Sequence, residues 1–291
     1  MRHLTRAQFG QVFEDQLGIQ LPDRPEQGIY EQSAIQNFRI GARKKENGRV
    51  FRYAYTVTGL PAVVAEARLV INSNYAPEVT GHVNEDGFMG NITFAGIART
   101  VPVPVGAAYL DIADTVARAV NWYQGGYCII FDDVTPYFHQ HYIIASALGT
   151  GTYVRIYLDH PTGAAIPVLN AGANPVGITA YRSPYSAVAV AGSVQVGFEP
   201  FIGMPLCGVI PALRYFWLMT AGPLWVAAHG AAWPGAAADQ RDVYAHQDGT
   251  IDPASQKDPT AGYQKVGYLL PMTGGTASDY GDAWIMLQLD Q

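Results

Sequence analysis

The feature that most limits the folds available to this chain is a series of short apolar segments, each followed by turn-forming residues. From residue 36 to the C-terminus they recur at intervals of roughly 8–15 residues, and Gly, Pro, Asn or Asp bounds each of them. Such spacing is typical of β-sandwiches and β-barrels. The sequence therefore predicts an all-β, mainly antiparallel fold with sandwich-like or barrel-like domains.

Alternation of side chains predicts which face a strand exposes. Residues 152–159 alternate apolar side chains with Tyr153, Arg155 and Tyr157. Because successive side chains of a strand point to opposite faces, this pattern predicts a half-buried strand with an aromatic outer face. The segment 111–120 is less decisive, since its Ala, Val and Ile residues fit either a helix or a strand.

Two turns are predicted from residue types that tolerate unusual backbone angles. Asn47-Gly48 precedes an alternating segment, 50–55, and Asn-Gly closes two-residue hairpins because both residues accept positive φ. Residues 220–223, Thr-Ala-Gly-Pro, separate two apolar runs and predict a second hairpin.

The first 35 residues lack a sustained pattern. A short helix is possible over residues 9–17, but the prolines within 21–25 break regular structure. We therefore expect residues 1–35 to form an extended N-terminal arm, followed by a first β domain over residues 36–120 and a second over residues 121–291.

Composition excludes several classes of protein. Charged residues make up 14% of the chain, against about 25% in average proteins, and aromatic residues make up 12%. This argues against a disordered chain or a coiled coil. A net charge of −6 argues against binding to nucleic acid. No apolar run reaches the roughly 18 residues of a membrane span, and the polar N-terminus does not resemble a secretion signal.

Two pairs of residues, the cysteines and two neighbouring histidines, carry side chains that could react or bind a metal. We expect neither a cofactor nor a metal at either pair. Cys128 and Cys207 lie in apolar runs and are expected to be buried thiols. His139 and His141 could chelate a metal from one face of a strand, but we interpret them as solvated loop histidines. The residues that could supply a third ligand are Asp132, Asp133, His82, His160, His229 and His246. Asp132-Asp133 and Asp248-Gly249 fit ordinary turns.

No catalytic motif is present. The sequence contains no Gly-x-Ser-x-Gly, no His-Glu-x-x-His and no phosphate-binding loop. The Gly-rich segment 149–152 leads into a predicted strand, so it lacks the helix N-terminus that binds phosphate. We therefore expect a protein that is not an enzyme.

Six of the 18 cations lie within fourteen residues around the first predicted hairpin. They either form a solvated hairpin tip or dock onto an acidic protein surface. These candidate docking residues are Arg39, Arg43, Lys44, Lys45, Arg49 and Arg52.

Several short stretches resemble structural proteins of tailed bacteriophages, and in particular capsid (head) decoration or head-stabilising proteins. The resemblance extends over most of residues 36–291 and rests on short stretches of similar sequence. The stretches are QNFRIGAR (36–43), GRVFRYA (48–54), GTYVRIYLD (151–159), YRSPYS (181–186), YFWLMTAGP (215–223) and GDAWIMLQL (281–289).

The resemblance implies a late, non-enzymatic virion protein that is made in the cytoplasm of a bacterial host. It would bind the outside of a capsid, with the major capsid protein as its partner, and cement neighbouring capsomers. Such proteins often form trimers, so a homo-oligomer is expected, with no membrane or nucleic-acid partner. The role of the major capsid protein itself fits less well, because that fold uses a long spine helix and the sequence shows no long amphipathic helix.

Two alternatives stay open. The chain could be a carbohydrate-binding or host-adhesion module, since β-sandwiches support both functions. Exposed aromatic rings would then stack on sugars; the candidates are Trp122, Tyr123, Trp225 and Trp233. The chain could also be another structural protein of the phage head or tail.

Overall fold

The protein is all-β, as the computed structural model shows, with antiparallel sheets curled into half-barrels. The part of the chain that the structure describes contains strands and no helix. The described residues are 27–60, 67–73, 79–81, 103–114, 116–132, 137–151, 153–165, 176–191, 199–208, 210–229, 241–253, 264–270 and 284–290. The predicted fold class is confirmed.

The larger sheet has eleven strands, and its central path runs β11-β4-β12-β13-β17-β16-β14-β15. β1 and β3 also pair with β13, and β2 pairs with β3. Its strands are β1 (Gln32–Ser33), β2 (Arg43–Glu46), β3 (Arg49–Thr56), β4 (Val70–Asn72), β11 (Val188–Val190), β12 (Phe201–Pro205), β13 (Arg214–Trp225), β14 (Asp242–Ala245), β15 (Ile251–Pro253), β16 (Lys265–Leu269) and β17 (Trp284–Gln288).

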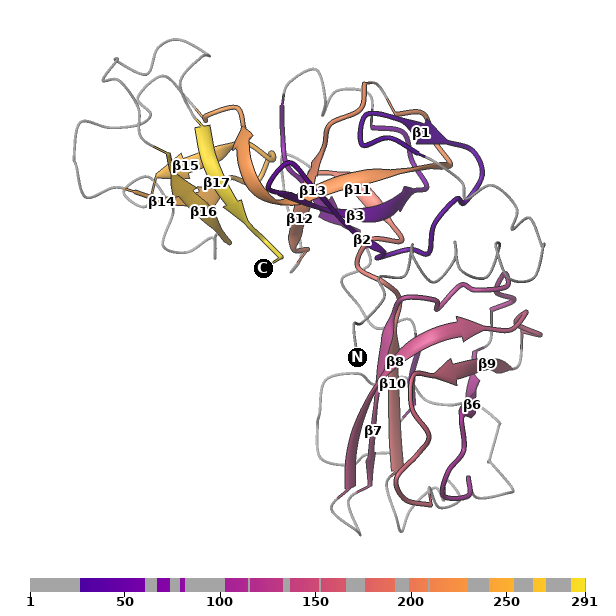
Figure 1. The fold of residues 1–291 in the computed structure, drawn as a ribbon. Helices are drawn as coiled ribbons and strands as arrows, with labels where there is room; N and C mark the ends of the chain where they lie inside the picture. The colour runs from indigo at the N-terminus through magenta and orange to yellow at the C-terminus, as the bar shows by residue number, and fades with distance from the viewer. Residues whose placement is uncertain are drawn as a thin grey trace, which may run out of the picture.

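The smaller sheet has six strands in the order β5-β10-β7-β8-β9-β6. It forms a separate body, below the larger sheet in Figure 1. Its strands are β5 (Val79–Gly81), β6 (Tyr109–Ala113), β7 (Tyr127–Asp132), β8 (Tyr137–Ser146), β9 (Tyr153–Leu158) and β10 (Val176–Tyr181). Of the segment 111–120, which fitted either a helix or a strand, residues 111–113 belong to β6, and residues 114 and 116–120 are neither helix nor strand.

The smaller sheet is an insertion into the larger one. The chain leaves the larger sheet after β4 and returns on β11, and these two strands pair directly, with Val188 opposite Asn72. An antiparallel pair brings the two ends of the inserted segment together, so the segment between them can form its own sheet. The division expected at residue 120 does not follow the sheets, because β6 pairs with β9 across it.

The last residues of the expected N-terminal arm belong to the larger body. Gln27 and Ile29 are buried, and Gln32 in β1 lies opposite Phe216 in β13. The Nε1–H of Trp217 donates to the carbonyl of Gln27 over 3.0 Å. Residues 1–26, including the possible helix at 9–17, lie outside the described residues.

The first predicted hairpin is confirmed. β2 and β3 pair with Glu46 opposite Arg49, and the two turn residues have positive φ, 50° at Asn47 and 75° at Gly48. The turn therefore depends on the backbone freedom that Asn-Gly provides.

The second predicted hairpin, at residues 220–223, is wrong. These residues lie inside β13, a continuous strand of 12 residues. Gly222 has a φ of +116° and lets the strand bend, and the register to β3 shifts just before it. Beyond this point β13 pairs with β17, with Pro223 opposite Met286. The Gly-Pro signal therefore marks a bulge at which the strand changes partner, and no chain reversal occurs.

Each body has its own apolar core. The inner face of the smaller sheet packs Leu110, Ile130, Ile143 and Ile156 together, all fully buried. The larger sheet buries clusters on both of its faces. The two bodies touch where Nη2 of Arg39 donates to the carbonyl of Ile143 over 3.1 Å.

Candidate functional site

The outer face of the smaller sheet carries a tyrosine on each of five neighbouring strands. Tyr109 lies opposite Tyr157, and Tyr127 lies opposite both Tyr142 and Tyr181, so these rings lie on one face of the sheet. We call this surface the tyrosine face; it consists of Tyr109, Tyr127, Tyr142, Tyr153, Tyr157 and Tyr181. All except Tyr181 are between 37% and 50% exposed.

Ring contacts and one ion pair organise the tyrosine face. Tyr127 and Tyr181 stack with their centroids 4.9 Å apart. Asp111 binds Arg155 through two hydrogen bonds, of 2.7 and 3.0 Å, and the guanidinium lies 4.2 Å from the centre of the Tyr109 ring. Because Asp111 and Arg155 neutralise one another, the face presents large aromatic area with little net charge.

Strand alternation explains why these tyrosines point outward. In β9, Val154, Ile156 and Leu158 are buried, whereas Tyr153 and Tyr157 are exposed. This confirms the aromatic outer face predicted for residues 152–159. Sequence analysis missed that four further strands extend it, because cross-strand neighbours are set by sheet pairing.

Three of the four aromatic residues predicted to stack on sugars lie outside the tyrosine face. Tyr123 is fully buried, and its hydroxyl donates to Asp114 over 2.7 Å. Trp122 is half-buried, with the guanidinium of Arg182 3.8 Å from its ring centre. Trp225 is half-buried against the larger core. Trp233 lies outside the described residues.

Two of the six candidate docking cations, Arg52 and Arg39, bind groups outside the β2–β3 hairpin. Arg52 forms a two-point ion pair with Asp290, in which its Nη2 lies 3.0 Å from Oδ1. Hydrogen bonding to Arg52 lowers the pKa of Asp290. Arg39 reaches the smaller body, where it bonds to Ile143 and lies over the Tyr142 ring at 4.9 Å. Both residues therefore stabilise the fold.

The remaining four cations stay on the hairpin. Lys44 pairs with Glu46 at 3.0 Å on the half-buried side of β2. Arg49 lies opposite Glu46 and is half-buried. Arg43 and Lys45 alternate with these residues and point to solvent. The exposed basic surface of the hairpin is thus smaller than six cations suggest.

The expected loop histidines lie on a strand. His139 and His141 are in β8, because this strand begins at Tyr137, and the side chain of His141 is completely buried. The expectation of solvated loop histidines is therefore wrong. Asp132 ends β7, and Asp133 lies outside the described residues.

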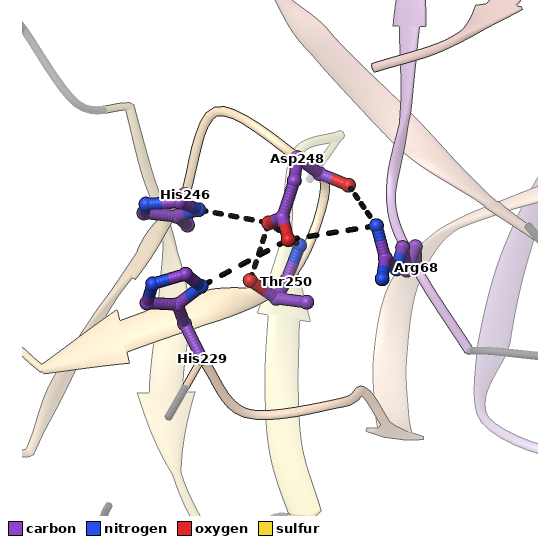
Figure 2. Close-up of polar contacts among 5 residues, drawn as sticks. All are labelled: Arg68, His229, His246, Asp248 and Thr250. Atoms are coloured by element: carbon purple, nitrogen blue, oxygen red, sulfur yellow. Dashed lines mark hydrogen bonds and ion pairs between the residues drawn. The ribbon is translucent and has the colours of Figure 1, made fainter. Parts of the chain in front are cut away.

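A second polar cluster, which sequence analysis did not find, surrounds Asp248. Figure 2 shows the Asp248 carboxylate between two imidazoles on one side and Arg68 on the other. Its Oδ1 lies 2.8 Å from Nδ1 of His246 and accepts a hydrogen bond from the Thr250 backbone N–H at 3.0 Å. Its Oδ2 lies 3.5 Å from Nη1 of Arg68 and 3.8 Å from Nδ1 of His229.

The Asp248 cluster joins three segments that are distant in the sequence. Gly249, next to Asp248, has a φ of +87° and accepts a hydrogen bond from the N–H of Leu69 at 2.7 Å. The predicted Asp-Gly turn is therefore confirmed, and it also anchors β4. The only sequence signal was local, since Asp followed two residues later by Thr is typical of a side-chain-capped turn.

Hydrogen-bond partners decide the ionisation of Asp248. Burial opposes its charge, but hydrogen bonds from Thr250 and His246 outweigh burial and lower its pKa to about 2. Asp252, on the neighbouring strand β15, behaves in the opposite way, because burial raises its pKa. The cluster is therefore built to hold one ionised carboxylate.

This ionisation predicts a pH dependence of stability. Asp248 is ionised above its unfolded-state pKa of 3.8, and the stability that it contributes is lost as the pH falls from about 4 to about 2. We expect Asp248→Asn to be less stable than the original protein at pH 6. That difference should shrink by up to about 2 kcal/mol at pH 2.

Urea unfolding of both proteins at pH 6, 4, 3 and 2 measures this difference. Asp242→Asn is the control, because it removes an exposed ion pair with Lys265 and should cost less than about 1 kcal/mol. A difference between Asp248→Asn and the original protein that stays constant with pH would contradict the assignment.

Both cysteines are buried free thiols, as predicted. Burial raises the pKa of Cys128 to about 12 and that of Cys207 to about 11. Since the thiolate is the reactive form, neither residue is suited to nucleophilic chemistry at neutral pH.

Comparison with known proteins gives no relative. No family model matches the sequence, no curated protein matches it, and no solved structure matches the fold. Among the described residues, no helix is long and apolar enough to cross a membrane.

Proposed function

We propose that this protein is a non-enzymatic structural component of a tailed-bacteriophage virion. It attaches to the outside of the capsid, contacts the major capsid protein and cements neighbouring capsomers. The tyrosine face is the attachment surface and the observation that carries the proposal. The resemblance of several short stretches to head-decoration proteins supports the same assignment.

The composition of the tyrosine face suits a protein partner. Tyrosine and arginine are enriched at the centres of protein interfaces, where a tyrosine buries a large area and loses few rotamers. The sheet holds the rings rigidly, and the Asp111–Arg155 pair satisfies its own charges before binding. Attachment therefore has a low cost in side-chain ordering.

The two-body architecture suits a clamp between subunits. A specific interface buries about 1,200–2,000 Å² in total. If the tyrosine face of each chain in a trimer meets one capsid subunit, the second and third contacts become effectively intramolecular. Arg43 and Lys45 on the larger body add a second, electrostatic contact to an acidic surface. Contacts that are individually weak then together hold the protein firmly on the capsid.

The test is co-sedimentation with capsids that lack the protein, prepared from virions in which this chain is found. A Tyr109→Ser/Tyr153→Ser/Tyr157→Ser variant should lose at least about 30-fold in affinity, which corresponds to about 2 kcal/mol over the contact centre. The variant changes only exposed rings, so its fold should persist and circular dichroism can check it.

The control is Tyr268→Ser, which removes an exposed tyrosine of the larger sheet and should leave binding unchanged. A Tyr109/Tyr153/Tyr157 variant that sediments with capsids like the original protein would refute the assignment of the surface. Absence of the chain from every virion would refute the function.

A carbohydrate-binding role is the alternative that the same surface supports. Exposed tyrosine rings stack on the apolar faces of sugars, and Asp111 and Arg155 offer hydrogen-bonding groups between the rings. A glycan array separates the two functions. Specific glycan binding that the Tyr109/Tyr153/Tyr157 variant loses, without capsid binding, would favour adhesion.

A further inference from the structure

Three imidazoles converge at one end of the smaller sheet's inner face. His139 and His141 lie two residues apart on β8 and point to the same side, and His160 follows β9. One ring nitrogen from each residue lies within 4.8 Å of the other two. The closest rings, those of His141 and His160, have centroids 4.2 Å apart.

His141 is the unusual member of this cluster. Its side chain is completely buried, yet neither ring nitrogen has a hydrogen-bond partner among the residues that the structure describes. Its Nδ1 lies 3.7 Å from the nearest carboxylate oxygen, on Asp159, which is beyond hydrogen-bonding distance. Leaving a buried polar group unpaired costs about 1–3 kcal/mol, so this ring needs a partner that no described side chain supplies.

The carboxylate of Asp159 orients His160. Its Oδ1 lies 2.8 Å from Nδ1 of His160 and also accepts a hydrogen bond from the Tyr142 N–H at 3.1 Å. This leaves Nε2 of His160 available. A carboxylate bonded to the distal nitrogen of a histidine is the usual support of histidine metal ligands, because it sets the ring's tautomer and orientation.

The loop that carries His160 is held in place. Buried Thr162 exchanges hydrogen bonds with Ala107, and its hydroxyl also donates to the carbonyl of Pro104 at 3.1 Å. Next to it, Gly163 lies so close to His139 that a Cβ at that position would be 3.0 Å from Cε1 of the ring. The hydrogen bonds of Thr162 therefore fix the loop, and glycine permits its close approach to His139.

We propose that His139, His141 and His160 form a binding site for one divalent transition-metal ion of the zinc type. Imidazole nitrogens suit zinc, nickel and copper, and three histidines with one open position form a known zinc arrangement.

Binding of a zinc ion would require only a small shortening of the distances between the three histidine nitrogens. Nitrogens bound tetrahedrally to zinc at 2.0–2.1 Å lie about 3.3 Å from one another. The three ligand nitrogens already lie within 4.8 Å of one another, and His160, which is 48% exposed, has room to move closer on binding. A bound ion would tie the loop after β9 to β8. The site departs from the expectation of a metal-free protein, and it does not depend on the proposed capsid attachment.

The test uses the full chain after treatment with a chelator. Isothermal titration with zinc chloride should give one ion per chain with a micromolar or lower Kd, and zinc-edge absorption spectroscopy should show three imidazole nitrogens at 2.0–2.1 Å. His160→Ala should weaken binding at least 10-fold. Because His160 is 48% exposed, this variant should keep its fold. His141→Ala should abolish binding, with circular dichroism as the check of its fold.

The matched control is the double variant His229→Ala/His246→Ala, which removes the histidines of the Asp248 cluster. That cluster also brings three potential ligands within 4.8 Å, but its carboxylate already bonds His246 and Thr250. The double variant should bind zinc like the original protein. Three results would each overturn the proposal: no saturable binding, unchanged affinity in His160→Ala, or loss of binding only in the double variant.

Discussion

Replacing Trp217 with alanine is expected to destabilise the larger body by about 3–5 kcal/mol, the usual cost of removing a buried large aromatic side chain. Trp217 is 2% exposed and lies in the first half of β13. Its ring packs against Phe38 and Tyr53, with both ring centroids 5.0 Å away. The variant would leave a cavity where three segments of the chain meet.

The same substitution also removes an attachment for residues 27–38. The indole N–H donates to the carbonyl of Gln27, and the buried Gln27 amide bonds Tyr53, Asn37 and the carbonyl of Tyr215. Losing the tryptophan leaves the Gln27 carbonyl without this donor, so backbone amides of this segment should exchange hydrogen faster. Unfolding in urea, followed by circular dichroism, and hydrogen-exchange mass spectrometry measure the two effects.

Trp284→Ala is the matched control. Trp284 lies on β17 and is 46% exposed, so its removal should cost less than about 1 kcal/mol. If Trp217→Ala unfolds at the same urea concentration as Trp284→Ala, the aromatic cluster does not hold the larger body together.

Gly126→Ala is expected to disrupt the smaller sheet, with a loss of about 3 kcal/mol or more. A Cβ at this position would lie 2.0 Å from the carbonyl oxygen of Tyr181 and 3.0 Å from that of Tyr123. Both contacts are with backbone, and the Tyr181 backbone cannot move without disturbing its pairing with Tyr127, where β10 meets β7. The strain therefore falls on the sheet itself.

The expected effect is local as well as large. Gly126 precedes Tyr127, and its carbonyl accepts the N–H of Ile143 at 2.9 Å. Hydrogen exchange should accelerate in β7, β8 and β10 more than in β3 and β13, because the two bodies have separate cores. The stacking of Tyr127 on Tyr181 should weaken too, so attachment through the tyrosine face should decrease.

Gly208→Ala is the control for this substitution. A Cβ at Gly208 meets no atom within 4 Å, so the change should alter stability by less than about 1 kcal/mol. Equal stability of Gly126→Ala and Gly208→Ala would mean that the close approach of β7 to Tyr181 relaxes at little cost.

The insertion of one sheet into the other links these results to the proposed function. The chain enters and leaves the smaller body beside a single strand pair, β4 and β11, and Arg39 bridges the two bodies. The smaller sheet can therefore present its tyrosine face as one rigid surface, and the larger sheet carries the exposed cations of the β2–β3 hairpin. A protein that clamps neighbouring subunits needs two such surfaces on one chain.

Local patterns in the sequence predicted local features well. Alternation in residues 152–159 identified a strand with buried Val154 and exposed Tyr153, because side chains of a strand alternate whatever the strand pairs with. Asn47-Gly48 predicted its hairpin, because its positive φ values depend on two residues alone. At residues 220–223 the same reasoning failed, since Gly-Pro is compatible with a turn or a bulge and only the neighbouring strands decide between them.

Side-chain periodicity and backbone preference in the sequence thus determined four features. These are the all-β class, the first hairpin, the aromatic face of one strand and the buried thiols. Tertiary structure decided which strands became neighbours: β4 with β11 around a whole inserted sheet, five strands whose tyrosines share one face, and His160 beside His141. Strand pairing depends on hydrogen bonds that any backbone can make, so its partners are selected by how the complete chain buries its apolar surface.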